Sequence, residues 1–418
     1  MNFSHLANKL RSKITKFSGI LSQDLDKTAR RFINEALYGI IGSQSVMLTE
    51  MGRQLESRVS LKKTEERFSR QLIKPEIWNC LHKRILSIAA DRVKDKTLLI
   101  LDLSDLQKKY GKKMEYLATV RDGSNKGELV DGFWTNQVIA SEVGSNEITP
   151  LHLSLYSQAS PDFSSENDEI KKAMNQVGNS VQNRGIWVID RGGDRATLYE
   201  SLLNNKRDFI VRMVGSRDVM VSGDIKARSL WLAYGCMLPY FRKVVRVIHG
   251  KEVTKNISFG FVPVKLPGQE TPLNMVVVKG IGFKPMLLLT NLHIKSAEKD
   301  LWFIVQAYMK RWSIEETIRF IKQTYDLENI RLLKYARLQN MMALLLAVFY
   351  FVSVILDQSH KLLVMTSHIL KSAIRVFGIP DFKYYAIGDG LGNIFSRYPG
   401  RLIKQPEIHH SQLSFGFC

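Results

Sequence analysis

The sequence predicts an α/β protein, and three observations support this fold class. Residues 98–101 and 186–189 are short apolar runs with the length and flanking residues of buried strands. Residues 1–91 instead place apolar side chains at helical spacing. A third stretch, residues 215–296, alternates strand-like runs with turn-forming segments such as residues 266–270. We therefore expect a helical domain, followed by a sheet-containing core that a strand-rich insertion interrupts.

The chain is long and strongly basic. Its 418 residues, 45% of them hydrophobic, suffice for a large core and for more than one domain. Lys and Arg number 60 against 40 Asp and Glu, and the resulting net charge of +20 is spread along the chain. This excess predicts a phosphate-rich partner, with an anionic membrane surface as the weaker alternative. The 3 cysteines show no metal-binding spacing and predict no disulfide framework, which fits a reducing cytosol.

One apolar run, residues 341–356, is a candidate for a membrane span. A spanning helix needs about 20 apolar residues, so we expect this shorter run to be a buried core helix. Lys9, Arg11 and Lys13 interrupt the N-terminus, which therefore lacks the continuous apolar stretch of a signal sequence. The sequence predicts a cytoplasmic protein that does not cross a membrane.

The helical domain expected over residues 1–91 carries basic faces. Residues 24–37 combine apolar positions at helical spacing with Lys and Arg on the other face, and residues 60–74 are basic and amphipathic. Small helices with basic faces suit the major groove of DNA. The alternative is a domain that only packs against the core.

Aspartates follow both apolar runs of the core. Asp102 comes directly after residues 98–101, and Asp190 directly after residues 186–189. A carboxylate at the end of a strand is held rigidly and can reach an open edge of the sheet. The alternative is that such acids cap turns or helices, which we expect of Asp194 at the start of the following helix.

A third acid lies on a predicted helix, within residues 308–322. Because each helical residue advances by about 100°, Tyr308, Arg311, Glu315 and Lys322 would share one narrow stripe. The simpler alternative is a solvated face on which Arg311 and Glu315 form an i,i+4 ion pair.

A possible restart of this helix limits the stripe. Ser313 and Glu316 form a capping-box pattern, at which a new helix would begin. In that case only Glu315 and Lys322 certainly share a face.

The spacing Y-x2-R-x3-E-x6-K resembles the Y-R-E-K signature of one large group of insertion-sequence transposases. That group has a DDE active site on an RNase H-like fold of the retroviral-integrase superfamily. The resemblance extends over residues 92–325, because Asp102 and Asp190 precede Glu315 in the expected order. It implies an RNase H-like catalytic core with an all-β insertion, preceded by a helical N-terminal domain and encoded by a bacterial mobile element.

The resemblance also implies a role for each site residue. The catalytic and metal-binding acids would be Asp102, Asp190 and Glu315. The residues that bind DNA phosphates would be Tyr308, Arg311, Lys322 and Arg212. The implied cofactor is a pair of Mg²⁺ ions, with Mn²⁺ as a substitute; two such ions about 3.5–4 Å apart can activate a water and stabilise a leaving oxygen.

The implied organisation has five parts. They are a helical N-terminal domain (1–91), the first part of the core (92–214), the β insertion (215–296), the second part of the core with the catalytic-Glu helix (297–360) and a basic C-terminal region (361–418). The implied partner is double-stranded DNA, as terminal inverted repeats and as target, bound by a homodimer in a synaptic complex. The protein would then be nucleoid-associated.

Three functions stay open on the sequence. They are a DDE transposase performing cut-and-paste transposition, an RNase H-like nuclease without strand transfer, and a catalytically silent DNA-binding descendant of a transposase. The three acids argue against the silent descendant, and the Y-R-E-K spacing favours the transposase. The family's base-stacking tryptophan has two candidates here, Trp231 and Trp302, and we expect core packing for each.

Overall fold

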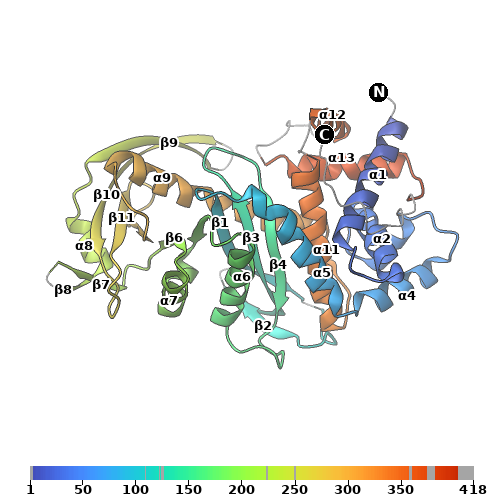
Figure 1. Ribbon diagram of the computed structural model, residues 1–418, viewed down its shortest axis with the longest axis horizontal. Coiled ribbons are helices and arrows are strands. Elements are labelled where there is room, and N and C mark those ends of the chain that lie inside the picture. The colour runs from blue at the N-terminus through green and yellow to red at the C-terminus, as the bar shows by residue number, and fades with distance from the viewer. Residues whose placement is uncertain are drawn as a thin grey trace.

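The computed structural model describes residues 3–108, 110–121, 123, 127–222, 225–248, 251–356, 360–373 and 382–402. The molecule is elongated, with helices from both ends of the chain at one end, strands of the insertion at the other, and the core sheet between them (Figure 1). A helical N-terminal region followed by a large mixed sheet confirms the predicted α/β class.

The N-terminal region folds as helices whose apolar faces are buried. They are α1 (Phe3–Leu21), α2 (Lys27–Ser43), α3 (Leu48–Arg53), α4 (Leu61–Leu72) and α5 (Glu76–Ala89), followed by the 3-10 turn Ala90–Arg92. Asp26 caps α2, because its side chain accepts a hydrogen bond from the backbone N–H of Ala29 at 2.8 Å. These helices pack on α11 and on one another, so they extend the core of the protein.

The core sheet contains β1 (Leu98–Gln107), β3 (Leu129–Ser141), β4 (Thr149–Tyr156), β5 (Ile186–Ile189) and β6 (Asp208–Arg212). Strand β3 runs antiparallel to both β1 and β4, whereas β1, β5 and β6 are parallel. The connections carry β2 (Ala118–Arg121), α6 (Glu166–Ser180), the 3-10 turn Arg191–Gly193 and α7 (Ala196–Asn204). The order β4-β3-β1-β5-β6 with these directions is that of an RNase H-like core.

The insertion after β6 extends the same sheet. Its elements are β7 (Asp218–Val221), β8 (Ile225–Arg228), α8 (Ser229–Gly235), β9 (Tyr240–Ile248), β10 (Lys251–Val264), β11 (Leu273–Lys279) and β12 (Met286–Thr290). Strand β12 pairs with β6, so the sheet continues as β6-β12-β11-β10-β9. The insertion is mainly β as predicted, but the short helix α8 interrupts it.

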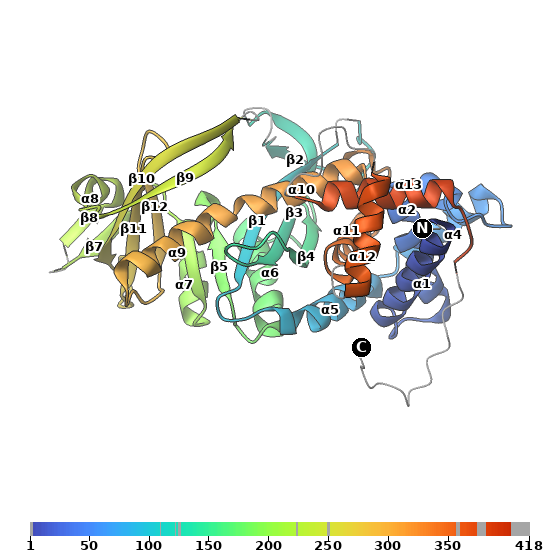
Figure 2. The same ribbon diagram turned by 90° about the horizontal axis from the view of Figure 1, so that it is seen from above.

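Helices α9 (Ala297–Lys310) and α10 (Trp312–Thr324) form one long rod across the sheet (Figure 2). Arg311 joins them with right-handed helical angles, φ −50° and ψ −32°. The capping box at Ser313 is not formed, because its hydroxyl donates to the carbonyl of Lys310 at 2.7 Å. The helix therefore does not restart at Ser313.

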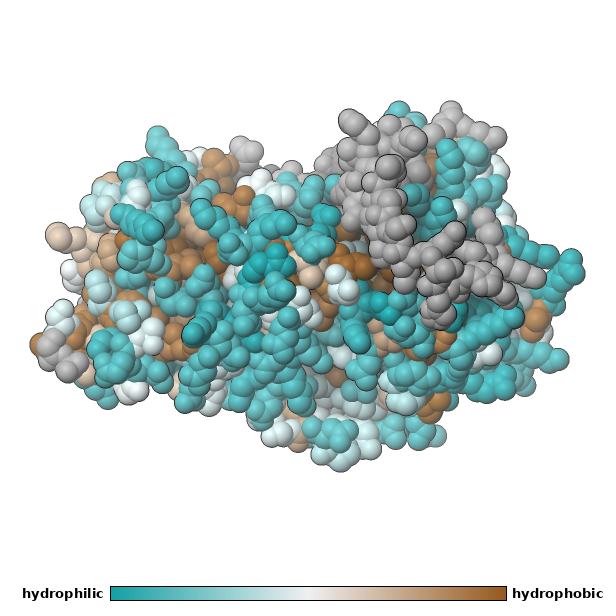
Figure 3. Space-filling view, in the orientation of Figure 1, coloured by the Kyte–Doolittle hydropathy of each residue, from teal (hydrophilic) through white to brown (hydrophobic). Residues whose placement is uncertain are grey.

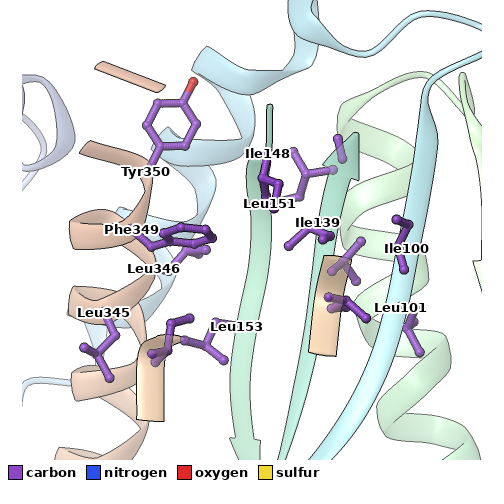
Figure 4. Close-up of a cluster of buried hydrophobic side chains, with 14 of the residues drawn as sticks. Ile100, Leu101, Ile139, Ile148, Leu151, Leu153, Leu345, Leu346, Phe349 and Tyr350 are labelled. Carbon is purple, nitrogen blue, oxygen red and sulfur yellow. The ribbon is translucent and has the colours of Figure 1, made fainter. Parts of the chain in front are cut away.

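Helix α11 (Tyr335–Tyr350) continues as the π-helical turn Phe351–Ile355 and packs on α5 and β4. Its side chains, Phe349 among them, face Leu151 and other apolar residues of β4 (Figure 4). The helical run Tyr335–Ile355 has 21 residues, which is long and apolar enough to cross a membrane, but 89% of its apolar window is buried in the protein. Burial, rather than the short length expected from sequence, marks it as the predicted core helix.

The C-terminal region contains the 3-10 turn Leu327–Asn329 before α11, and α12 (His360–Ser372) and α13 (Tyr384–Arg397) after it. The glycines at 388, 390 and 392 suggest turns in the sequence, but all three lie inside α13. They permit close helix packing, because a Cβ at Gly390 would lie 2.2 Å from the carbonyl oxygen of Ile369 in α12. The rest of the basic tail, residues 403–418, lies outside the described residues.

Candidate active site

Three parallel strands bring predicted site residues to one edge of the sheet. Leu101 of β1 pairs with Ile189 of β5, which in turn pairs with Val211 of β6. The residues that follow these three in the chain are Asp102, Asp190 and Arg212. Because parallel strands in register carry successive residues to the same edge, Asp102 of β1, Asp190 directly after β5 and Arg212 of β6 lie at that edge.

Asp102 does not end its strand, contrary to the prediction. Strand β1 continues to Gln107 through its pairing with β3, in which Asp102 lies opposite Gln137. What ends at Leu101 is the pairing with the short strand β5. Asp102 is therefore fixed by the sheet on one side, faces an open edge on the other, and has a side chain that is 18% exposed.

Arg311 connects the α9–α10 rod to this edge. Its Nη1 donates to Oδ2 of Asp102 at 3.0 Å, and its Nη2 donates to the carboxylate of Glu315. The guanidinium is 8% exposed and lies 5.9 Å from the centre of the Tyr308 ring. The i,i+4 pair of Arg311 and Glu315 is thus formed, but as part of a bridge to Asp102 rather than on a solvated face.

The Asp102 carboxylate lies in an environment that disfavours negative charge. Burial and the charge of Asp190 raise the pKa of Asp102 to about 7, although the charge of Arg311 opposes this rise. Asp190 itself is partly exposed and accepts one hydrogen bond, at Oδ1, from the backbone N–H of Gly192 at 2.7 Å. A further cation at this edge would stabilise Asp102 in its charged form.

The acids fit a divalent cation in kind and in charge. Carboxylate oxygens are the ligands that Mg²⁺ prefers in proteins, and burial, together with the charges of Asp190 and Glu315, raises the pKa of Asp102. In the described part of the chain, however, no three His, Cys, Asp or Glu side chains are already grouped to hold a metal ion. Arg311 lies between Asp102 and Glu315 instead, so a metal held by both acids would require its guanidinium to move.

Lys322 faces a different pair of acids, about two helical turns beyond Glu315. Its ammonium lies 3.3 Å from Oε1 of Glu328 and 3.8 Å from Oδ1 of Asp105. Asp105, which is 7% exposed, therefore pairs with Lys322. The structure brings Lys322 to β1 but not into contact with Asp102 or Glu315.

Asp194 belongs to the packing of the core. It accepts hydrogen bonds from the backbone N–H of Val214 at 2.6 Å and from the hydroxyl of Tyr199 at 3.0 Å, and it forms an ion pair with Arg217. The prediction that it caps α7 is wrong, because Arg195 precedes that helix and Asp194 follows the 3-10 turn before it.

The two tryptophans have different environments. Trp302 of α9 is half-buried and stacks on Phe259 of β10, with ring centres 5.8 Å apart, as core packing predicts. Trp231 of α8 is 78% exposed, so core packing is wrong for this residue. Tyr234 and Met237 are also exposed beside it in the chain, and Figure 3 shows apolar surface at the end of the molecule formed by the insertion.

Sequence reasoning passed over Lys310, the residue before Arg311. It is half-buried and lines a hollow between α9 and β9. Helical spacing places it off the stripe of Tyr308, Arg311 and Glu315, so the stripe gives no signal for it. The signal available in the sequence was that Lys310 and Arg311 are adjacent basic residues at the possible junction of two helices.

The family comparison covers most of this site. Residues 152–351 match the family model described as the transposase DDE domain. The matched range contains Asp190, Arg212 and the whole α9–α10 rod, and it begins after Asp102.

Solved structures and curated proteins give no further support for the family. Among solved structures, the cryo-EM structure of a piggyBac transposase synaptic complex with hairpin DNA matches with a TM-score of 0.43 and 10% identity, over 96% of this chain and 82% of that chain. No curated protein matches the sequence. The family match therefore carries the comparison: residues 152–351 are similar to the transposase DDE domain, the kind of domain that the spacing of Tyr308, Arg311, Glu315 and Lys322 predicted.

Proposed function

We propose that this protein is a DNA transposase that cleaves phosphodiester bonds at the ends of its mobile element and joins the freed 3′-hydroxyl to target DNA. One observation carries the proposal. Asp102 and Asp190 lie on neighbouring strands at one sheet edge, and Arg311 links Glu315 to Asp102 there. Two acids beside the ends of paired strands and one acid on a helix are a donor set that suits phosphodiester cleavage, and the similarity of residues 152–351 to the transposase DDE domain supports this assignment.

In this proposal Asp102, Asp190 and Glu315 hold divalent cations, Mg²⁺ or Mn²⁺ in its place. When bound, a pair of such ions activates the attacking oxygen and stabilises the leaving oxygen. The contribution of the chain is rigidity, since two acids are fixed by strands of one sheet and the third by the α9–α10 rod. Rigid placement matters because catalysis depends on holding the reacting groups in the productive geometry.

The basic residues of the site would hold DNA phosphates. The guanidinium of Arg311 is a planar fork that fits two phosphate oxygens as well as it fits carboxylates. The hydroxyl of Tyr308 beside it is buried and has no hydrogen-bond partner among the described residues. Lys322 would exchange Asp105 and Glu328 for a phosphate, and Arg212 would contribute from the end of β6.

The proposal extends to the whole chain. The net charge of +20 supports contact with double-stranded DNA, as inverted repeats and as target. We assign DNA contact to the helical domain of residues 1–91 and catalysis to residues 92–214 and 297–360, with residues 215–296 as the insertion and 361–418 as a basic C-terminal region. Bringing two element ends together would require a homodimer, acting on the nucleoid of a bacterial cell.

A cleavage and strand-transfer assay tests this proposal. Purified protein is incubated with DNA that carries its own element ends, in Mg²⁺ or in EDTA, alongside Glu315→Gln and Glu316→Gln. Glu316 is the matched control, because it is the adjacent acid on α10 and forms a surface ion pair with Arg319. We expect Glu316→Gln to keep activity within about twofold of the wild type.

Each outcome has a separate meaning. Metal-dependent cutting and joining that only Glu315→Gln abolishes would support the transposase. Cutting without joining would favour a nuclease that lacks strand transfer. Wild-type protein that binds these ends in Mg²⁺ and never cuts them would contradict the proposal.

A further inference from the structure

A hollow lies between helix α9 of the core and strand β9 of the insertion. Its volume is about 410 Å³. Its apolar lining includes Val244, Trp302 and Met309, and its polar lining includes Gln306, Lys243 and Lys310. An ion pair between Arg242 of β9 and Glu298 of α9 joins the same two elements. We call this feature the β9–α9 hollow.

Lys310 is a half-buried cation of the hollow that no carboxylate neutralises. Burial lowers its pKa. Two other lysines with largely buried side chains both have oxygen partners: Lys108 donates to two backbone carbonyls and Lys322 faces two carboxylates. Within the described ranges, Lys310 has neither kind of partner. Holding a charged group in a partly desolvated place without a counter-ion costs free energy, which an anion in the hollow would offset.

Lys243 supplies a second cation from the opposite wall. It lies on β9 opposite Asn256 of β10 and is exposed, and none of the described carboxylates forms an ion pair with it. Its neighbour Arg242 is already paired with Glu298. Two ammonium groups without carboxylate partners, one from the core and one from the insertion, therefore line one hollow with an apolar wall.

We propose that the β9–α9 hollow binds the sugar–phosphate backbone of a DNA strand. Phosphates would contact Lys243 and Lys310, and a deoxyribose would pack against Trp302 and Met309. The cations suit the phosphates of a DNA backbone and the apolar wall suits its sugars, which alternate along that backbone.

This inference rests on the proposed function, because it needs a DNA strand at the catalytic acids. Lys310 directly precedes Arg311, which contacts Asp102 and Glu315. A DNA strand that passes from these acids along the rod would therefore meet Lys310, and with it the hollow, one residue away from Arg311. None of the three acids lines the hollow, which makes it a separate contact. Since its contacts are to phosphate and sugar, it would fix the position of the DNA without reading its sequence.

The salt dependence of binding tests the inference. The logarithm of the binding constant for duplex DNA falls with the logarithm of salt concentration, with a slope of about −0.9 per phosphate contact. The probe is a short duplex of mixed sequence, and the measurement is fluorescence anisotropy at several salt concentrations. We expect Lys243→Gln to reduce the slope by about 1 and the double variant Lys243→Gln/Lys310→Gln to reduce it by about 2.

A matched control removes two lysines that are already neutralised. Lys171 and Lys172 of α6 form ion pairs with Asp168 and Glu169, so Lys171→Gln/Lys172→Gln should keep the wild-type slope. Lys310→Arg should also keep it, because the charge stays in place. Lys243 is exposed, so its variant tests the hollow even where a change at Lys310 alters folding.

Failure of this inference differs from failure of the proposed function. A wild-type slope in both Lys243→Gln and the double variant, with metal-dependent cleavage by the wild type intact, would overturn the inference alone. Wild-type protein that does not bind duplex DNA would overturn the proposed function and the hollow together. A reduced slope in the double variant with binding retained in Glu315→Gln would establish a phosphate contact separate from the acids.

Discussion

Asp190 and Asp194 flank the same 3-10 turn, Arg191–Gly193, and belong to opposite kinds of environment. Asp194 is 8% exposed and is held by the N–H of Val214, by Tyr199 and by Arg217. Asp190 is partly exposed, and among the described residues one backbone N–H, that of Gly192, binds its carboxylate. A carboxylate saturated by protein donors stabilises the fold, whereas one with free oxygen atoms beside a second acid is available to a ligand.

The two arginines that serve these regions differ in the same way. Arg217 binds the carboxylate and the carbonyl of one residue, Asp194, and lies 5.3 Å from the Tyr199 ring. Arg311 spans two acids from elements far apart in the chain, and its Nε has no hydrogen-bond partner in the described structure. The first arrangement is closed, and the second can exchange partners.

The largest expected effect separates catalysis from stability at Asp190. Asp190→Asn removes a charge that the proposed function assigns to metal binding, so single-turnover cleavage should fall by roughly 10³-fold or more, a barrier increase of about 4 kcal/mol. Its free energy of unfolding in urea should change by less than about 1 kcal/mol, because the side chain is partly exposed and makes one hydrogen bond. Cleavage at the wild-type rate would remove Asp190 from the site.

Asp194→Asn should show the reverse pattern. It leaves Arg217, whose side chain is 19% exposed, without its counter-ion, so we expect a loss of about 3 kcal/mol in urea unfolding. Cleavage per folded molecule should stay within a few-fold of the wild type. The variant Arg217→Gln combined with Asp194→Asn should lose less stability than the two single losses added, since both changes break one pair.

The buried histidine pair of α5 and β4 extends the comparison to pH. Nδ1 of His152 lies 2.9 Å from Nε2 of His82, and Nε2 of His152 lies 2.9 Å from the Ser154 hydroxyl. Burial lowers the pKa of His82 from 6.5 to about 4 and lowers that of His152 well below its ordinary value. The unfolded chain therefore binds protons that the native chain rejects, and stability falls as pH drops from about 6.5 towards 4, by about 3 kcal/mol from His82 alone.

Urea unfolding between pH 7 and pH 4 measures this effect. The pH dependence of the free energy of unfolding is compared between wild type and His82→Gln. This comparison isolates the histidine, because Asp102 contributes to the pH dependence with the opposite sign in both proteins. Because the pKa of Asp102 is raised to about 7, the folded protein binds this proton at a higher pH than the unfolded chain does, so a fall in pH stabilises the fold through Asp102. If His82→Gln leaves the pH dependence unchanged, the buried histidine does not cause it.

Local patterns explain why much of this site could be read from the sequence. An apolar run followed by an acid predicts both a strand and a carboxylate beside it, so Asp102 and Asp190 could be proposed as a pair without knowledge of the sheet. The continuation of β1 past Leu101 could not be found, because it depends on pairing with β3. The pairing of Lys322 with Asp105 and Glu328 likewise depends on contacts between distant segments, which no spacing encodes.

Burial shows the same limit. Apolar spacing predicted core packing for both tryptophans, yet Trp231 lies on a short helix whose surroundings leave it 78% exposed. The close approach of Ile369 to Gly390 of α13, which leaves no room for a side chain, is likewise not visible in the sequence. Both features depend on which distant residues lie next to the residue in the fold.

Exchange of partners at Arg311 gives the smallest expected effect. Arg311→Gln removes the cation that competes for Asp102 and Glu315, so Mg²⁺ should bind about tenfold more tightly in the absence of DNA, a gain of about 1.4 kcal/mol. Titration calorimetry with the metal alone measures this affinity. Cleavage should nevertheless weaken, because the same guanidinium would hold a phosphate once DNA is bound.

Arg319→Gln is the matched control for Arg311, since Arg319 lies on the same helix and pairs with Glu316 at the surface. It should leave Mg²⁺ affinity unchanged. Weaker Mg²⁺ binding in Arg311→Gln would contradict the exchange, because it would mean that the guanidinium holds Asp102 and Glu315 in the geometry that the metal needs. Arg311 would then stabilise the site in the way that Arg217 stabilises Asp194. The two arginines would have the same role, and the difference between the surroundings of Asp190 and of Asp194 would lie in the carboxylates alone.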